Sequence, residues 1–132
     1  MIRVVVADDE ENIRLGLARQ LEEMNLDLEI IALCENGRQV MDAMDQHPDL
    51  LLIDINMPYM NGLECIEEIR AKAVQCILII ISGYDRFDYA QRAIQNKVDY
   101  YLLKPVDDDE FTQVIEEAVK THYQRMEERT NC

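Results

Sequence analysis

Five short apolar runs alternate with five segments of helical periodicity along this chain of 132 residues. The runs are Ile2–Ala7, Leu28–Cys34, Leu50–Ile53, Cys76–Ile81 and Tyr100–Leu103. Most of them are near-continuous Val, Ile and Leu, a pattern typical of strands buried on both faces of a parallel sheet. Strict alternation of strand and helix predicts an α/β fold, a doubly wound sandwich with right-handed crossovers.

Apolar residues between and after the runs recur at helical spacing, and we interpret each stripe as the face that a helix packs on the sheet. The stripes are Ile13, Leu17, Leu21 and Met24; Val40, Met41 and Met44; Leu63, Ile66 and Ile69; Phe87, Ala90 and Ile94; and Phe111, Val114, Ile115, Ala118 and Val119. Carboxylates at positions 107–110 crowd the start of the last helix, where they are expected to cap it. Residues 1–120 should form one domain, and the polar residues 121–132 should extend the last helix or begin a linker.

Charge and hydropathy exclude several classes of protein. The formal net charge of −14 repels phosphate backbones, so we expect no direct binding of DNA or RNA by this chain. The longest apolar run, Ile77 to Ile81, is too short to cross a membrane. The N-terminus leads straight into a predicted strand without the layout of a signal peptide, so a cytoplasmic location is expected.

The cysteines and histidines suggest no metal site or disulfide framework. Cys34, Cys65, Cys76 and Cys132 are too widely separated for either. We expect the first three to be small buried residues and Cys132 to be an incidental thiol on the tail. The isolated residues His47 and His122 are expected at the surface.

Polar side chains stand where four of the predicted strands end. Asp8 and Asp9 follow the first strand, Asp54 the third, Ser82 the fourth and Lys104 the fifth. The carboxyl ends of parallel strands share one edge of the sheet, and such folds bind ligands there. Taken singly, Asp8 and Asp9 could cap a helix, Asp54 could lie in a loop and Lys104 on the surface. Their common position at one edge instead favours a functional cluster.

The chemistry of this cluster indicates phosphoryl transfer assisted by a metal ion. Three carboxylates at close range repel one another unless a cation neutralises them. Mg²⁺ suits such a site, because it typically uses one or two carboxylates and keeps positions for water and phosphate oxygens. An ionised aspartate beside the ion can then attack a phosphoryl donor and form an aspartyl phosphate. Lys104 would pair with the anionic oxygens, and the Ser82 hydroxyl would hydrogen-bond to another.

Short motifs surround these residues. They are Asp8-Asp9-Glu10, Asp54-Ile55-Asn56-Met57-Pro58, Met57-Pro58-Tyr59-Met60-Asn61-Gly62, Ser82-Gly83 and Lys104-Pro105. Together they resemble the receiver domains of two-component response regulators, over nearly the whole chain from Ile2 to about Val119. The resemblance implies a flavodoxin-like (βα)5 fold with strand order 2-1-3-4-5. It also implies a phosphoacceptor switch rather than an enzyme, with at most self-phosphorylation from small donors and self-dephosphorylation.

Carried over position by position, the resemblance implies that Asp54 accepts a phosphoryl group from a sensor histidine kinase. Asp9 and Asp54 would ligate Mg²⁺ together with the backbone carbonyl of Asn56, and Asp8 would act through water. These roles come from the family and not from the spacing of the residues.

The resemblance also implies how the signal leaves the site. Ser82 and Lys104 would contact the phosphoryl oxygens, and Tyr101 would be an aromatic switch that turns inward when Ser82 moves. Output would then pass through the face made by the fourth helix, the fifth strand and the fifth helix, by homodimerisation or partner docking.

Some positions depart from the family pattern or carry a backbone expectation. Lys97 stands where many relatives have glycine, and Ser82 replaces the commoner threonine but keeps the hydroxyl. The pair Asn61-Gly62 tolerates left-handed turn geometry. A cis bond between Lys104 and Pro105 is expected from the family alone, since most such bonds are trans.

Two further stretches suggest the kind of output. Residues 82–90 and 101–107 resemble receivers fused to AraC-type helix-turn-helix domains, so the chain is expected to be the N-terminal part of a longer DNA-binding transcriptional regulator. A stand-alone receiver that acts by protein contact is the nearest alternative. A Mg²⁺-dependent phosphatase of the haloacid-dehalogenase kind would need an aspartate where Asn56 stands. A flavin-binding domain would need a phosphate-cradling loop where Asp8 and Asp9 stand.

Overall fold

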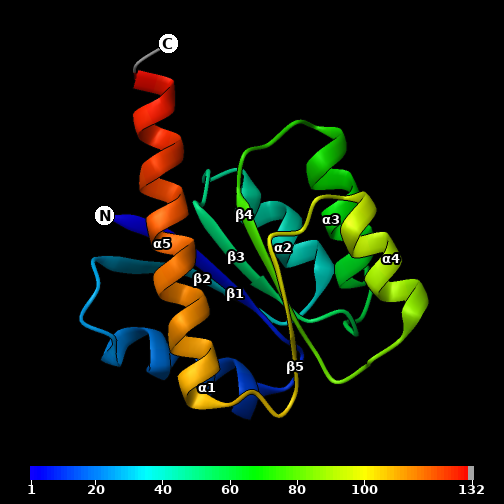
Figure 1. Ribbon diagram of the computed structural model, residues 1–132. Coiled ribbons are helices and arrows are strands. Elements are labelled where there is room, and N and C mark those ends of the chain that lie inside the picture. The colour runs from blue at the N-terminus through cyan, green and yellow to red at the C-terminus, as the bar shows by residue number, and fades with distance from the viewer. Residues whose placement is uncertain (131–132) are drawn as a thin grey trace.

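Five parallel strands form one central sheet in this computed structural model, which describes residues 1–130. The strands are β1 (Ile2–Ala7), β2 (Leu28–Cys34), β3 (Leu50–Ile53), β4 (Ile77–Ser82) and β5 (Tyr100–Leu103). Their order in the sheet is β2-β1-β3-β4-β5 (Figure 1). This order confirms the predicted flavodoxin-like fold and puts the reversal of winding between β1 and β3, where such sheets bind ligands.

Helices cover both faces of the sheet. The helices α1 (Glu11–Glu23) and α5 (Asp108–Thr130) pack on one face, and α2 (Gly37–Met44), α3 (Gly62–Ala71) and α4 (Phe87–Gln95) on the other (Figure 1). Successive residues of β1 alternate between the two resulting cores, with Val4 and Val6 facing α1 and α5, and Val5 and Ala7 facing the other helices. This double burial explains why the strands are continuously apolar.

The fourth helical stripe lies largely on the outer face of α4 and not, as predicted, against the sheet. Phe87 and Ile94 are 82% and 77% exposed, whereas Ala93 is buried and Tyr89 packs partly against the core. An apolar stripe shows that a helix is amphipathic but does not show what covers the stripe. The prediction that Phe87 and Ile94 belong to the core is therefore wrong.

Two strand predictions also need correction. The fourth strand runs from Ile77 to Ser82, one residue later than predicted, so Ser82 is its last residue. β2 is largely half-buried rather than buried on both faces. It lies at the edge of the sheet, and its register with β1 shifts between Val4 and Val5.

The last helix continues to Thr130, so the polar segment after residue 120 is helical as far as the structure describes it. Asp107 caps its start by accepting a hydrogen bond from the Glu110 amide at 3.1 Å, as expected. No helix within residues 1–130 combines the length and the apolar character that a membrane span requires.

Cys34, Cys65 and Cys76 are buried as predicted, and Cys132 lies outside the described residues. His47 is exposed as expected. His122 is half-buried, and its ring meets Tyr123 edge-on with centroids 5.4 Å apart.

Gly62 is needed for close packing and not for a left-handed turn. Asn61 has an extended backbone and forms a capping box with Glu64 at the start of α3. The backbone of Gly62 is not left-handed either, but a Cβ atom there would lie 2.2 Å from the carbonyl oxygen of Asp54. The absence of a side chain lets α3 begin directly against the end of β3.

Lys97, which stands where many relatives have glycine, and Lys104 both have unusual backbone geometry, and only that of Lys104 was predicted. Lys97 has a φ of 54°, the left-handed conformation that glycine adopts at less cost. The bond from Lys104 to Pro105 is cis.

A matched pair of glycine substitutions tests the packing argument. Gly62→Ala should lower the free energy of unfolding by about 1–3 kcal/mol, because the clashing atom is a backbone carbonyl that cannot move aside. Gly16→Ala, in the middle of α1 with no atom near the added Cβ, should instead raise it by about 0.5–1 kcal/mol. Urea unfolding followed by circular dichroism measures both. Equal effects of the two substitutions would contradict the proposed close approach.

Candidate functional site

The ends of β1 and β3 bring two acidic side chains together. Ala7 and Ile53 are register partners in these neighbouring strands, and the Asp54 amide donates to the Ala7 carbonyl at 3.0 Å. The Asp8 amide donates to the Cys34 carbonyl of β2, also at 3.0 Å. The first residues after β1 and β3 are therefore fixed side by side. Asp8 is 1% exposed and Asp54 is 4% exposed.

Lys104 supplies the cation for both acids. Its amide donates to the carbonyl of Ser82 at the end of β4, at 2.8 Å. Its Nζ atom lies 2.8 Å from Oδ2 of Asp8 and 3.4 Å from Oδ2 of Asp54. The sheet thus brings three of the predicted residues into direct contact from the ends of three different strands.

The balance of charge in this contact perturbs Asp54 and Lys104. Burial raises the pKa of Asp54 to about 6; the charge of Lys104 opposes that rise, and the charge of Asp8 adds to it. Burial lowers the pKa of Lys104, but the hydrogen bond to Asp8 and the charge of Asp54 outweigh it and leave that pKa raised. One ammonium group therefore serves two buried carboxylates, and negative charge remains in excess.

A second group of acids adjoins the first through Asp8. Asp8, Asp9 and Glu10 each offer a carboxylate oxygen, and these oxygens lie within 4.8 Å of one another. Asp9 and Glu10 are exposed, and so is Asn56, two residues after Asp54. The donors are all oxygens, which fits a hard cation such as Mg²⁺ better than a softer metal.

Two contacts near Asp8 were not predicted from the sequence. Oδ1 of Asp8 accepts from the Glu10 amide at 2.9 Å, which orients the carboxylate. Arg14 of α1 donates to the carbonyl oxygen of Asp8 at 2.8 Å. Glu10 directly follows Asp9 and could have been added to the acidic group on that ground, but nothing in the sequence pairs Arg14 with a backbone carbonyl.

Ser82 and Tyr101 meet at the backbone of Tyr84, in the loop after β4. Ser82 is completely buried, and its hydroxyl accepts from the Tyr84 amide at 3.1 Å. The hydroxyl of Tyr101 donates to the Tyr84 carbonyl at 3.0 Å. Burial raises the pKa of Tyr101, and the neighbouring Ser82 hydroxyl partly offsets that rise. A displacement of Ser82 would therefore disturb the loop segment that anchors Tyr101.

Comparison with protein families and curated proteins gives one consistent result. Residues 4–116 match the response regulator receiver domain. An uncharacterized response regulatory protein of Staphylococcus epidermidis is 36% identical over 126 residues, 95% of this chain and 49% of the relative. The transcriptional regulatory protein HptR of Staphylococcus aureus is 35% identical over 122 residues, 92% of this chain and 48% of its own length. The chain therefore spans about half the length of these relatives.

Solved structures of response regulators also resemble this chain. The REC domain of AraT, a response regulator from Geobacillus stearothermophilus, superposes with a TM-score of 0.83 at 35% identity, covering 95% of this chain and 98% of that one. A DNA-binding response regulator of the LuxR family from Staphylococcus aureus gives a TM-score of 0.81 at 32% identity, covering 89% of this chain and 98% of that one.

The raised pKa of Asp54 predicts a pH-dependent gain in stability on substitution. The folded chain binds the Asp54 proton more tightly than the unfolded chain does, since the pKa moves from 3.8 to about 6. Stability is therefore lost as the pH rises through that window. Without divalent cations, Asp54→Asn should stabilise the chain at pH 7 by up to about 3 kcal/mol.

The gain should shrink as the pH falls from 7 to 4 and should vanish only below the unfolded-state pKa of 3.8, where Asp54 is protonated in both states. Chemical unfolding of both proteins across this pH range measures the difference. A gain that is the same at both ends of the range would show that ionisation of Asp54 is not its cause.

Proposed function

The chain belongs to the response regulator receiver family, and we propose on that premise that Asp54 accepts a phosphoryl group from a sensor histidine kinase. The observation that carries the proposal is the position of Lys104, whose Nζ atom contacts both Asp8 and Asp54 inside a buried site. Such a site combines a nucleophile, a cation for the phosphoryl oxygens and an excess of carboxylates. It acts as a switch that is modified and reset, not as a turnover enzyme.

The transfer step uses the ionised form of Asp54. With a pKa of about 6, its carboxylate is mostly ionised at neutral pH. A carboxylate oxygen attacks phosphorus, and the bond from phosphorus to the imidazole nitrogen of the donor breaks, with the electron pair left on that nitrogen. Lys104 follows the new negative charge on the phosphoryl oxygens, and the buried Ser82 hydroxyl turns to donate to another of them.

The oxygen donors at this edge fit a magnesium ion. Asp9 and Asp54 would hold it together with the backbone carbonyl of Asn56, and Asp8 would assist through water. When bound, Mg²⁺ supplies the positive charge that lets the attacking carboxylate and the phosphoryl oxygens come together. The excess negative charge around Asp8 and Asp54 supports this assignment, because a single ammonium group does not neutralise it.

The signal leaves the site along the path from Ser82 to Tyr101. When Ser82 turns toward the phosphoryl group, its hydrogen bond to the Tyr84 amide is lost. The Tyr84 carbonyl then shifts, and Tyr101 loses the acceptor that holds its hydroxyl near the surface. Tyr101 turns inward against the core of α2, α3 and α4, to which its ring already belongs in part.

The output is transcription regulation by a DNA-binding domain that follows this receiver, of the AraC type. HptR is named a transcriptional regulatory protein, and this chain covers 48% of its length. A net charge of −14 suits a module that leaves contact with DNA to another domain. We infer a cytoplasmic location, where kinase and DNA are both accessible. A stand-alone receiver acting by protein contact remains the alternative.

The face of α4, β5 and α5 is the surface on which two phosphorylated copies meet. Phe87 and Ile94 of α4 are the most exposed large apolar residues there, and Leu103 of β5 is 43% exposed. Large exposed apolar surfaces mark sites of interaction, and we assign that role to this face. Tyr101 lies on the same strand as Leu103, so its movement changes this face directly.

Phosphorylation is tested with the small donor acetyl phosphate. In the presence of Mg²⁺ the intact mass should rise by one phosphoryl group, because the site itself provides the nucleophile and the charge stabilisation. Asp54→Asn should abolish the rise, and removal of Mg²⁺ with a chelator should do the same. The matched control is Asp45→Asn, at the exposed end of α2, which should leave labelling unchanged. A phosphoryl mass gain that persists in Asp54→Asn would refute the assignment of Asp54 as the phosphoacceptor.

The dimer surface is tested by sedimentation of the phosphorylated chain. Ile94→Glu should weaken self-association at least about 10-fold, since it puts a charge into an apolar contact, without changing the phosphoryl mass gain. Leu33→Glu, at a 42% exposed residue on edge strand β2, is the control and should associate like the parent chain. If only the Leu33 variant fails to associate, the copies meet through a different surface.

A further inference from the structure

The last helix changes character along its length. Its first part buries Phe111, Ile115 and Ala118 against the sheet, whereas no side chain from residue 120 to residue 130 is buried. We call residues 120–130 the α5 extension. Figure 1 shows it projecting past the N-terminus and beyond the body of the domain. Burial of apolar surface therefore does not hold this extension in place.

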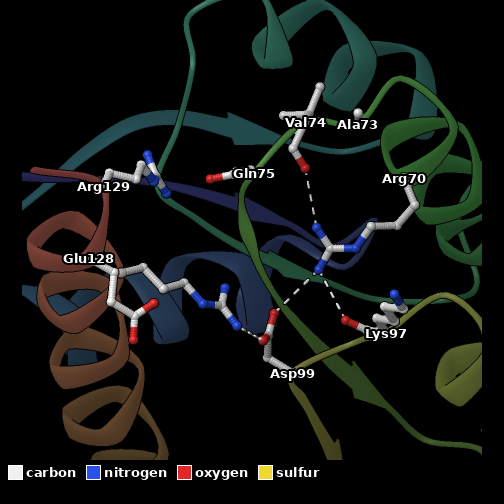
Figure 2. Close-up of a pocket in the computed structure, with 9 residues that line it drawn as sticks. Arg70, Ala73, Val74, Gln75, Lys97, Asp99, Glu128 and Arg129 are labelled. Carbon is white, nitrogen blue, oxygen red and sulfur yellow. Dashed lines mark hydrogen bonds and ion pairs between the residues drawn. The ribbon is translucent and has the colours of Figure 1, made fainter. Parts of the chain in front are cut away.

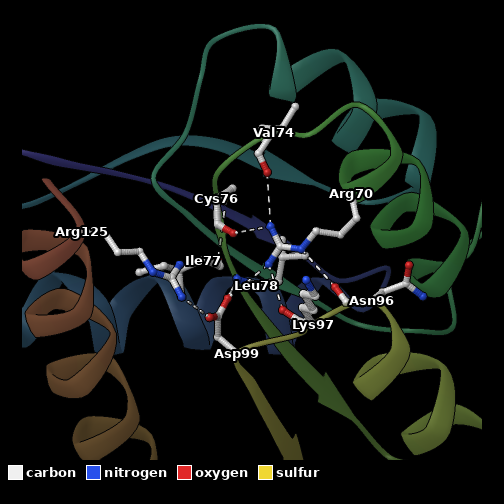
Figure 3. Close-up of polar contacts among 9 residues, drawn as sticks. All are labelled: Arg70, Val74, Cys76, Ile77, Leu78, Asn96, Lys97, Asp99 and Arg125. Carbon is white, nitrogen blue, oxygen red and sulfur yellow. Dashed lines mark hydrogen bonds and ion pairs between the residues drawn. The ribbon is translucent and has the colours of Figure 1, made fainter. Parts of the chain in front are cut away.

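One ion pair ties the α5 extension to the sheet. Nη2 of Arg125 lies 2.9 Å from Oδ1 of Asp99 (Figure 3). Within residues 1–130 it is the only ion pair or side-chain hydrogen bond that links the extension to another element. The Arg125 side chain is 42% exposed, so solvent competes for it.

Asp99 is a fixed partner for Arg125. Its Oδ2 atom accepts from the Leu78 amide at 2.9 Å and from Nη2 of Arg70 at 3.4 Å. Arg70 is itself held by the backbone carbonyls of Asn96, Val74, Cys76 and Lys97, at 3.1, 3.2, 3.1 and 3.0 Å (Figure 3). These contacts hold the Asp99 carboxylate to the sheet and to Arg70, so it does not follow Arg125 when helix and sheet move relative to each other, and the pair breaks instead.

A cleft lies beside the pair and leaves room for such movement. It has a volume of about 580 Å³, and its lining includes Arg70, Gln75, Lys97 and Glu128 (Figure 2). Because every donor of Arg70 is used by the protein, we regard the cleft as space between the body and the α5 extension rather than as a binding site for an anion.

Asp99 is also joined to the phosphoacceptor site through β5. It directly precedes Tyr100, the first residue of that four-residue strand, and Lys104 directly follows Leu103, the last. An extended strand cannot lengthen, so a pull at one end is felt at the other. In the proposed transfer step, Lys104 follows the phosphoryl oxygens; the sheet edge at β5 would then shift relative to α5, and Asp99, which stays with the sheet, would separate from Arg125.

We propose, on the basis of the proposed function, that the Arg125–Asp99 pair is a latch for the α5 extension and that phosphorylation of Asp54 opens it through β5. The extension is the part of the chain nearest to any domain that follows. Release of the latch would change how such a domain is held.

Hydrogen exchange of peptides from residues 120–130, read by mass spectrometry on the full 132-residue chain, tests the latch. Arg125→Gln should speed exchange by about threefold to fivefold, because loss of a partly exposed ion pair lowers the free energy of local opening by a corresponding amount. Arg129→Gln, one turn further along in the same cleft, is the matched control and should change it less than about twofold. Exchange in Arg125→Gln equal to that of the parent chain would overturn the latch.

The coupling is tested by the same measurement after Mg²⁺ and acetyl phosphate. The phosphorylated parent chain should exchange in residues 120–130 as fast as unphosphorylated Arg125→Gln does. Phosphorylation of Arg125→Gln should not raise its exchange rate further. A parent chain that gains phosphoryl mass with unchanged or slower exchange would overturn the coupling alone. A chain that gains no phosphoryl mass would overturn the proposed function and the coupling with it. The comparison of the unphosphorylated parent chain with unphosphorylated Arg125→Gln would still decide the latch.

Discussion

The ammonium group of Lys104 stands between two carboxylates that solvent hardly reaches, those of Asp8 and Asp54. A buried carboxylate is strongly disfavoured without a cationic partner, so the ends of β1 and β3 can carry these acids only because β5 delivers Lys104 to them. The partnership is incomplete, since one positive charge faces two negative ones. Burial, together with that remaining imbalance, raises the pKa of Asp54, and the excess of negative charge is what the proposed magnesium ion and phosphoryl group would meet.

The same contact ties the end of β5 to the acidic edge of the sheet. Both ends of this short strand finish in ionic contacts, Lys104 at the site edge and Asp99 at the opposite edge. Tyr101 lies between them and is tied to the loop after β4 by the Tyr84 carbonyl. Contacts of Lys104, Asp99 and Tyr101 thus hold the strand at three points, which limits how it can move independently of its neighbours. In the mechanism that we propose, a change of charge at Asp54 would therefore reach the outer face and the α5 extension together.

The sequence predicted what depends on periodicity and failed where tertiary contact decides. Apolar runs located all five strands, four of them with the bounds that the structure has, because burial on both faces leaves few polar positions in the strands inside the sheet. The meeting of Asp8, Asp54 and Lys104 followed from strand direction alone. Arg14 could not be found this way, since its partner is a backbone carbonyl, which carries no side-chain signal in the sequence. Gly62 could not be explained either, because only the fold shows how closely Asp54 approaches it.

The misassigned stripe on α4 is itself informative about function. α3 buries five residues, including Leu63, Ile66 and Ile69, whereas α4 buries only Ala93 and turns Phe87 and Ile94 outward. A helix with so little buried apolar surface is held weakly, and elements that move in regulation come from the weakly held part of a fold. The exposed side chains of α4 gain burial only if the helix shifts or a partner covers them. The exposed stripe contributes little to the stability of the domain as it stands, and it is the surface that the proposed dimer would cover.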